Sequence, residues 1–113
     1  MLTKQQIKAI ADKYVAYMES HSHIQLTILN EYTIEKPYGL IFFYTSKQFK
    51  ETGDFKYAIA GNAPFLVENT TGRVVNFGTA MADEYYITGY ENKTLIPTLD
   101  RYWYPETETY SHK

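Results

Sequence analysis

The chain of 113 residues contains no cysteine, which excludes disulfide bonds, a thiol nucleophile and a thiolate metal site. Its formal net charge is only −2 at pH 7, so it lacks the basic field that attracts nucleic acid. No stretch approaches the roughly 18 apolar residues of a membrane helix. Lysines and glutamines interrupt residues 1–14, which therefore lack the apolar centre of a signal peptide. These absences predict a soluble, cytoplasmic protein that binds neither nucleic acid nor membrane.

Signatures of catalysis are also missing. Neither the Walker pattern nor the GxSxG elbow occurs in the sequence. Only three histidines are present, and His112 lies in the terminal tail. His21 and His23 would share one face of a strand, but no third metal ligand has matching spacing, so we interpret them as a polar corner. We accordingly predict no enzymatic activity, no metal and no cofactor.

Two pairs of carboxylates could in principle serve acid–base catalysis. Asp83 and Glu84 are neighbours on an expected helix, where adjacent side chains point in different directions. Glu106 and Glu108 lie in the terminal tail. We interpret both pairs as solvated surface.

Aromatic residues are abundant instead. They make up 17% of the chain, and twelve of them are tyrosines. Tyrosine can pack its ring and leave its hydroxyl in water, so it suits core edges and recognition surfaces alike.

The length of the chain favours one domain, because a second domain would have too little core of its own. We predict a single domain over residues 1–113, with a core in residues 1–95 and an aromatic C-terminal extension in residues 96–113.

A first helix is predicted over residues 4–19. Thr3 and Gln6 form a capping box at its start, and Leu2 and Ile7 stand where a hydrophobic staple would place them. Apolar side chains then recur at helical spacing along one face. These residues are Ile7, Ile10, Ala11, Tyr14 and Met18.

The pattern changes to a period of two after this helix. Residues 24–34 alternate between apolar and polar, as a half-buried strand does, and only Leu29 and Asn30 are out of phase. Those two residues predict a bulge or a bend. Residues 35–39 then supply a turn that contains one proline and one glycine.

A central strand is predicted over residues 40–46. This stretch is almost continuously apolar, which is typical of a strand covered on both faces. Residues 47–54 are interpreted as a polar connection. Residues 55–60 fit a short helical turn or the lead-in to the next strand, and the periodicity does not decide between them.

A hairpin follows. Pro64 suits the first position of a strand, where its missing N–H is tolerated, and Phe65 and Val67 would face one way with Leu66 facing the other. The next four residues, 69–72, form a loop of hairpin length that ends in Gly72, where a left-handed residue is commonly required. Residues 73–77 return as the partner strand.

Turn-forming residues flank this hairpin on both sides. Gly61 and Asn62 could line a pocket with backbone amides, but we favour a tight turn before the strand. Gly78 ends the second strand, and Thr79 can cap a following helix whose first turns contain Asp83 and Glu84. Those acidic residues are favourable to the helix dipole.

The fold class that these elements predict is α+β. An N-terminal helix would pack on a small antiparallel sheet of about four strands, with a second helix after the last hairpin. Residues 101–104 would form a short edge strand or pack as a tail.

Two groups of side chains are candidates for binding a partner. Tyr85 would lie beside the acidic edge that Asp83 and Glu84 form, on the helix face opposite the core. Residues 102–104 bring Tyr102, Trp103 and Tyr104 together. Tyrosine and tryptophan often anchor protein interfaces. The alternative is that these rings simply close the edge of the core.

A series of short motifs between residues 38 and 90 resembles a known family. The block GNAPFLV over residues 61–67 is the most specific of them, and TGRVV and GTA follow at residues 71–75 and 78–80. Tyr38 with Gly39, residues 52–54, and Glu84 with Tyr85 complete the pattern. In these motifs the chain resembles the YrhB-like family, also called immunity protein 35.

The resemblance implies a binding protein rather than a catalyst. Members of this family look like immunity proteins of bacterial toxin systems, which protect the producing cell by blocking a cognate protein toxin. It also implies a helix, a small antiparallel sheet and a second helix. The motif residues set the fold rather than inhibit the toxin. They are Gly61, Asn62, Pro64, Phe65, Gly72, Gly78 and Thr79.

Three hypotheses follow for the function. The first is an immunity protein that neutralises its toxin by stoichiometric occlusion. The second is a small cytoplasmic chaperone-like protein that binds unfolded clients through an exposed apolar patch, as has been considered for a relative of this family. The third, a hydrolytic enzyme, requires a pocket in which a histidine meets a carboxylate or hydroxyl, and nothing in the sequence favours it.

Overall fold

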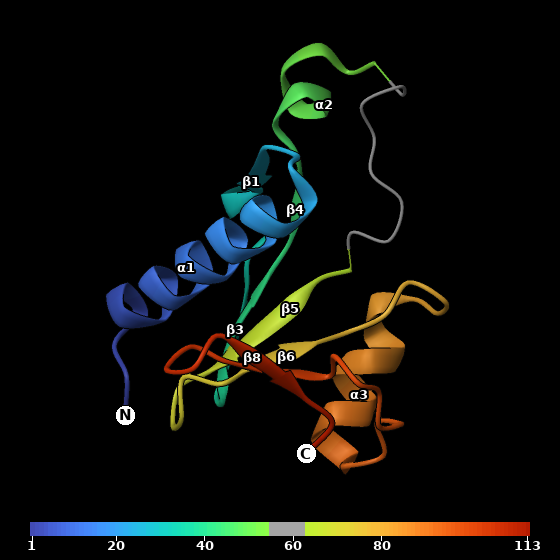
Figure 1. Ribbon diagram of the computed structural model, residues 1–113. Helices are drawn as coiled ribbons and strands as arrows, with labels where there is room; N and C mark the ends of the chain where they lie inside the picture. Colours follow the sequence, from blue (N-terminus) through green and yellow to red (C-terminus); the bar gives the residue numbers. More distant parts are fainter. Residues whose placement is uncertain (55–62) are drawn as a thin grey trace.

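A six-stranded antiparallel sheet forms the centre of the protein in a computed structural model, which describes residues 1–54 and 63–113. Helices α1 (Lys4–Ser22) and α3 (Asp83–Asn92) lie on opposite sides of this sheet (Figure 1). The strand order is β2-β3-β5-β6-β7-β8. The bounds of these strands are Ile34–Lys36, Gly39–Phe42, Phe65–Glu68, Val74–Asn76, Tyr102–Tyr104 and Thr109–Ser111.

The predicted α+β class with an N-terminal helix on an antiparallel sheet is confirmed. The expected number of about four strands is not. Besides the six-stranded sheet, β1 (Leu26–Ile28) and β4 (Tyr44–Ser46) pair in a separate two-stranded sheet. Strands β1 and β4 come from residues 24–34 and 40–46, where the apolar pattern does not show where one strand ends and the next begins.

Helix α1 begins with the predicted capping box. The Gln6 amide donates to Thr3 Oγ1 over 3.1 Å, and the Thr3 amide donates to Gln6 Oε1 over 2.8 Å. The helix runs three residues beyond the predicted end and stops at His23, whose backbone is left-handed with φ 60° and whose N–H donates to the Glu19 carbonyl. Its buried stripe packs on the sheet and consists of Ile7, Ala11, Tyr14 and Val15.

Two predicted strands are each divided in the structure. Residues 24–34 form β1 and β2 with a short 3₁₀ helix, η1 (Asn30–Tyr32), between them, at the place where the alternation fails. Residues 40–46 are not one central strand. They divide at Phe43 into β3 and β4, which belong to different sheets. The Phe43 carbonyl accepts a hydrogen bond from the Leu29 amide over 2.7 Å, which joins the two breaks.

The predicted polar connection contains a further helix, α2 (Lys47–Thr52). Ser46 caps it, since its hydroxyl accepts from the Phe49 amide over 3.0 Å, and Gly53 ends it with φ 70°. With β1 and β4 it forms the end of the molecule farthest from α3 (Figure 1).

The β5–β6 hairpin is formed as predicted. Phe65 and Val67 join the apolar cluster beneath α1, whereas Leu66 joins the cluster beneath α3. Gly72 has the left-handed backbone that the loop requires, with φ 76°. Pro64 stands just before β5 and its carbonyl accepts from the Phe77 amide over 3.0 Å.

The start of α3 differs from the prediction. Ala82, not Thr79, is the N-cap residue, and it provides no side-chain hydrogen bond. Residues 79–81 instead form a bend before the helix, and Gly78 packs against the Tyr86 ring. Asp83 and Glu84 then occupy the first turn, where their charge favours the helix dipole.

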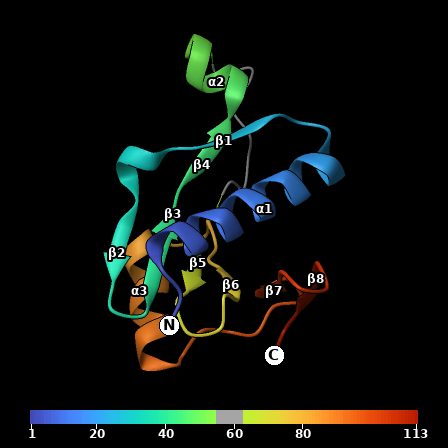
Figure 2. The same cartoon turned by 90° about the vertical axis from the view of Figure 1, so that its left-hand side faces the viewer.

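A second hairpin, β7–β8, follows α3. Because β7 pairs with both β6 and β8, residues 102–104 form an interior strand and not the edge strand or tail that the sequence suggested. Strand β8 takes the edge (Figure 2). The hairpin joins segments far apart in sequence, since Tyr110 in β8 contacts Tyr14 in α1.

The segment predicted as a helical turn or strand lead-in, residues 55–60, lies outside the described residues. So do Gly61 and Asn62, which were interpreted as a tight turn.

Candidate functional site

The first predicted contact group lies at the exposed start of α3. Tyr85 is 52% exposed, whereas its neighbour Tyr86 is buried against the sheet. Asp83 and Glu84 are exposed beside it. The helix therefore places Tyr85 and the acidic side chains on the face opposite the core, as the sequence predicted.

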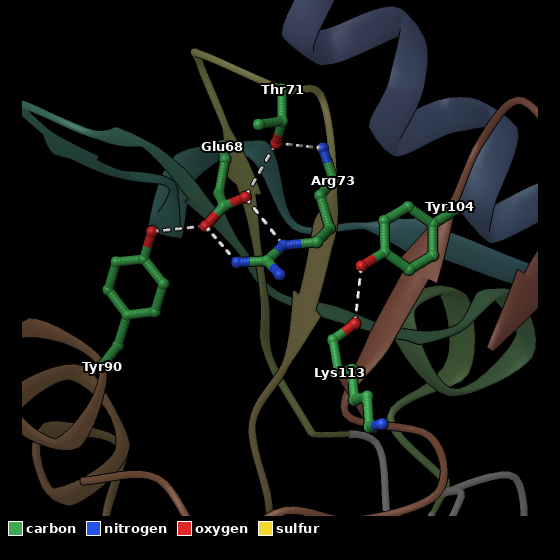
Figure 3. Close-up of polar contacts among 6 residues, drawn as sticks. All are labelled: Glu68, Thr71, Arg73, Tyr90, Tyr104 and Lys113. Atoms are coloured by element: carbon green, nitrogen blue, oxygen red, sulfur yellow. Dashed lines mark hydrogen bonds and ion pairs between the residues drawn. The ribbon is translucent and has the colours of Figure 1, made fainter. Parts of the chain in front are cut away.

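The second predicted group does not form one surface. Trp103 is 0% exposed and packs under α1, with ring centroids 4.9 Å from Tyr14 and 5.3 Å from Tyr17. Its indole therefore belongs to the core and offers no contact to a partner, as the alternative interpretation held. Tyr102 and Tyr104 point to the opposite face of β7 and are half-buried. The Tyr104 hydroxyl donates to the Lys113 carbonyl over 2.6 Å (Figure 3).

An exposed apolar group of side chains lies at the start of α3 and in the two loops that flank this helix. We call it the α3 surface and define it by Met81, Tyr85, Ile96 and Leu99, of which Leu99 is 85% exposed. The loop before α3 and the loop after it approach each other, because Ala80 and Thr98 line one pocket. A neighbouring pocket of 420 Å³ is lined by Glu84, Tyr85, Thr88, Gly89, Thr94 and Leu95. The start of α3 and the following loop thus present several apolar side chains to solvent beside two carboxylates.

A buried ion pair lies at the β5–β6 turn (Figure 3). Glu68 is only 5% exposed, and its two oxygens accept hydrogen bonds from Arg73 Nε and Nη2, both over 2.9 Å. The Thr71 hydroxyl donates to Oε1 over 2.8 Å and the Tyr90 hydroxyl donates to Oε2. Burial alone would raise the pKa of Glu68, but the hydrogen bonds from Arg73, Tyr90 and Thr71 outweigh it and hold the pKa below its ordinary value.

A pocket of 490 Å³ opens beside this ion pair. Arg73 places its guanidinium 4.0 Å from the centre of the Tyr102 ring, within cation–π range. Tyr38 and Tyr90 pack with ring centroids 4.8 Å apart, and the Tyr38 hydroxyl donates to Glu91 Oε2 over 2.6 Å. The lining residues are Tyr38, Arg73, Gly89, Tyr90, Glu91, Lys93, Leu95 and Tyr102.

Sequence reasoning missed this network. Glu68 and Arg73 flank the hairpin loop, and opposite charges at those positions are a signal that two strands bring them together. Tyr90 comes from a different element, so no spacing in the sequence relates it to Glu68.

The histidines have local contacts. His21 stacks on the Tyr17 ring with centroids 4.1 Å apart, and His23 ends α1. Within residues 1–54 and 63–113, no three potential metal ligands gather in one place. In those same ranges, every helix is too short or too polar to cross a membrane.

Comparison with curated proteins finds a similar bacterial protein. The chain is 40% identical over 55 residues to the uncharacterized protein YrhB of Escherichia coli (strain K12). The match covers 49% of this chain and 58% of the relative, which is less than two thirds of its length. The expected likeness to YrhB is confirmed over this part of the chain, and the relative's name assigns no activity.

No family model matches the chain, and no solved structure does.

Proposed function

We propose that this chain is an immunity protein that binds a cognate bacterial toxin and neutralises it by stoichiometric occlusion. The proposal includes membership of the immunity protein 35 group, which the motifs between residues 38 and 90 suggest. The structural observation that carries it is the α3 surface. The start of α3 and its flanking loops expose a tyrosine, three further apolar side chains and two carboxylates.

This composition suits the centre and rim of a protein interface. Tyr85 can bury its ring at low cost in conformational freedom, and such aromatic anchors supply a large share of binding energy. Asp83 and Glu84 would remain at the rim, where charges chiefly speed and orient encounter with a basic partner face. The toxin would be blocked by fit, without any bond being made or broken.

The test combines rescue and binding. The toxin candidate is the protein encoded beside this gene, expressed in cells with and without the wild-type chain. We expect rescue of growth and a 1:1 complex in solution. Tyr85→Ala should weaken the complex at least about fivefold, because truncating a central aromatic anchor typically costs more than about 1 kcal/mol.

A matched control is available on another surface. Tyr32 is also well exposed but lies in η1, away from α3, so Tyr32→Ala should leave both binding and rescue unchanged. Failure of the wild-type chain to bind or rescue against the encoded neighbour would refute the immunity proposal.

The same exposed side chains also favour the second candidate, a small chaperone-like protein. Its apolar patch would bind many unfolded clients weakly. Suppressed aggregation of several unrelated proteins, reduced by Leu99→Ser and with no tight partner, would favour that function over toxin immunity.

A further inference from the structure

Arg101 is a buried cation without a carboxylate partner. The Arg101 residue is 6% exposed, and among the described residues its guanidinium donates only to neutral carbonyls. Nε and Nη2 donate to the Ile96 carbonyl over 3.2 and 2.9 Å, and Nη1 donates to the Asn76 carbonyl over 2.6 Å. In the described part of the chain, no carboxylate forms an ion pair with it, and residues 55–62 contain no acidic residue. Buried charges are normally paired, so the Arg101 guanidinium retains the capacity to pair with an anion.

Arg101 lines a pocket of 470 Å³ at the end of the sheet. A guanidinium has five N–H groups, and these three hydrogen bonds leave two of them without an acceptor among the described residues. Four tyrosines form much of the wall. They are Tyr14, Tyr44, Tyr86 and Tyr110.

The hydroxyls of Tyr14 and Tyr110 already use their protons. The Tyr14 hydroxyl donates to Asn76 Oδ1 over 2.8 Å, so in its 3.1 Å contact with Tyr110 it must accept. Asn76 Nδ2 donates to the Asp100 carbonyl over 2.8 Å, which fixes the orientation of the amide. Arg101 is therefore the charged donor that remains in this pocket.

We propose that the pocket binds a carboxylate group through Arg101, with the tyrosine rings packing on the group that carries it. The planar fork of a guanidinium matches a carboxylate in shape and charge. The carboxylate can belong to a free small acid or to an acidic side chain of a bound protein. This inference does not depend on the immunity proposal.

The negative charge of Asp100 allows an electrostatic test of carboxylate binding. Asp100 also lines the pocket and is exposed, and its carboxylate accepts from the Thr98 hydroxyl over 3.1 Å. A negative charge at that place opposes a bound anion. Asp100→Asn keeps the acceptor for Thr98 and removes the charge, so it should tighten carboxylate binding by about threefold.

The first experiment titrates the ¹⁵N-labelled protein with benzoate and follows the Arg101 Nε–H resonance. Benzamide, which has the same ring and no charge, is the control ligand. We expect a saturable shift with benzoate and none with benzamide. Equal shifts with both compounds, or no shift with benzoate, would overturn the proposal.

The second experiment compares variants. Asp100→Asn is paired with Glu106→Gln, which changes the net charge equally at an exposed position outside the pocket. Only the first should tighten benzoate binding, and equal effects would contradict recognition of charge at this site. Arg101→Lys keeps the charge but loses the fork, and should weaken binding about tenfold. If Arg101→Lys does not fold, the comparison of Asp100→Asn with Glu106→Gln still tests the proposal.

A third titration distinguishes the sources of the carboxylate. Its probe is a glutamate residue blocked at both ends as amides, so that only the side chain is charged. Tighter binding of this probe than of benzoate supports a protein side chain as the occupant, and the reverse order supports a free acid. Absence of binding by both probes would refute the proposal.

Discussion

Glu68 shows how one side chain can hold several elements together. Its carboxylate connects both strands of the β5–β6 hairpin to α3 through Arg73 and Tyr90. Because the group is buried, its hydrogen bonds act in a low dielectric and losing one leaves partners without an acceptor. The carboxylate therefore stabilises a tertiary contact as well as a turn.

Replacing this carboxylate should destabilise the protein measurably. We expect Glu68→Gln to lower the free energy of unfolding by about 2 kcal/mol at pH 7, since the Arg73 guanidinium would stay partly buried without a counter-charge. Urea unfolding measures the difference. Glu35→Gln is the control, because its ion pair with Lys4 is largely exposed and should contribute almost nothing. Equal losses in the two variants would contradict this role of Glu68.

The pH dependence has a definite sign. The pKa of Glu68 is lowered in the folded state, so its stabilising contribution is present above the ordinary value of 4.5 and is lost as the pH falls toward the folded pKa. The stability difference between the wild type and Glu68→Gln should therefore shrink on acidification from pH 7 to pH 3. A difference that stays constant over this range would show that the carboxylate charge is not responsible.

At the scale of elements, local chemistry predicts some boundaries well. The capping box at Thr3 fixes the start of α1, and the left-handed position of Gly72 fixes the β5–β6 loop, because both signals act within a few residues. The break at Phe43 could not be predicted, since an apolar run is compatible with one strand or with two strands in different sheets. The position of β7 depends on pairing with β6, which sequence periodicity does not encode.

The candidate site could be predicted only in part, because sequence patterns report local structure and not contacts between distant elements. Helical spacing correctly placed Tyr85 outward and Tyr86 inward. It could not show that Trp103 is in the core, because a short aromatic run has no period that separates a buried strand from an exposed one. The Glu68 network and the Arg101 pocket arise from contacts between distant elements.

Pairing of β3 with β5 depends on Gly39. A Cβ added there would lie 2.1 Å from the Val67 carbonyl oxygen, an atom of the neighbouring strand that cannot move alone. Gly39→Ala should therefore cost more than about 3 kcal/mol of folding free energy. Gly53→Ala is the control, since Gly53 is also at positive φ but faces open space, and should cost about 1 kcal/mol. Similar costs, measured by thermal or urea unfolding, would exclude a steric role for Gly39.

The whole molecule is closed by its C-terminal hairpin. A chain ending at residue 100 would lack β7 and β8 and would expose the β6 edge together with the site under α1 that Trp103 fills. We expect this truncation to lose cooperative unfolding and to aggregate, because unpaired strand edges and apolar cores associate. Circular dichroism during heating and size-exclusion chromatography measure both effects.

A shorter truncation provides the comparison. A chain ending at Ser111 keeps both strands. It loses the bond between the Tyr104 hydroxyl and the Lys113 carbonyl and the bond from the Lys113 amide to Ser111 Oγ, so it should still unfold cooperatively. Cooperative unfolding of the chain that ends at residue 100 would contradict a structural role for the hairpin.

The contact between α1 and the last hairpin also orders events during synthesis. Tyr14 and Tyr110 are 96 residues apart, and Trp103, the partner of Tyr110 in the β7–β8 pairing, packs against Tyr14. A nascent chain therefore carries its first helix out of the ribosome long before the indole that covers it has been made. Final closure of this layer must await synthesis of the β7–β8 hairpin, and α1 is the segment that cellular folding factors would meet first.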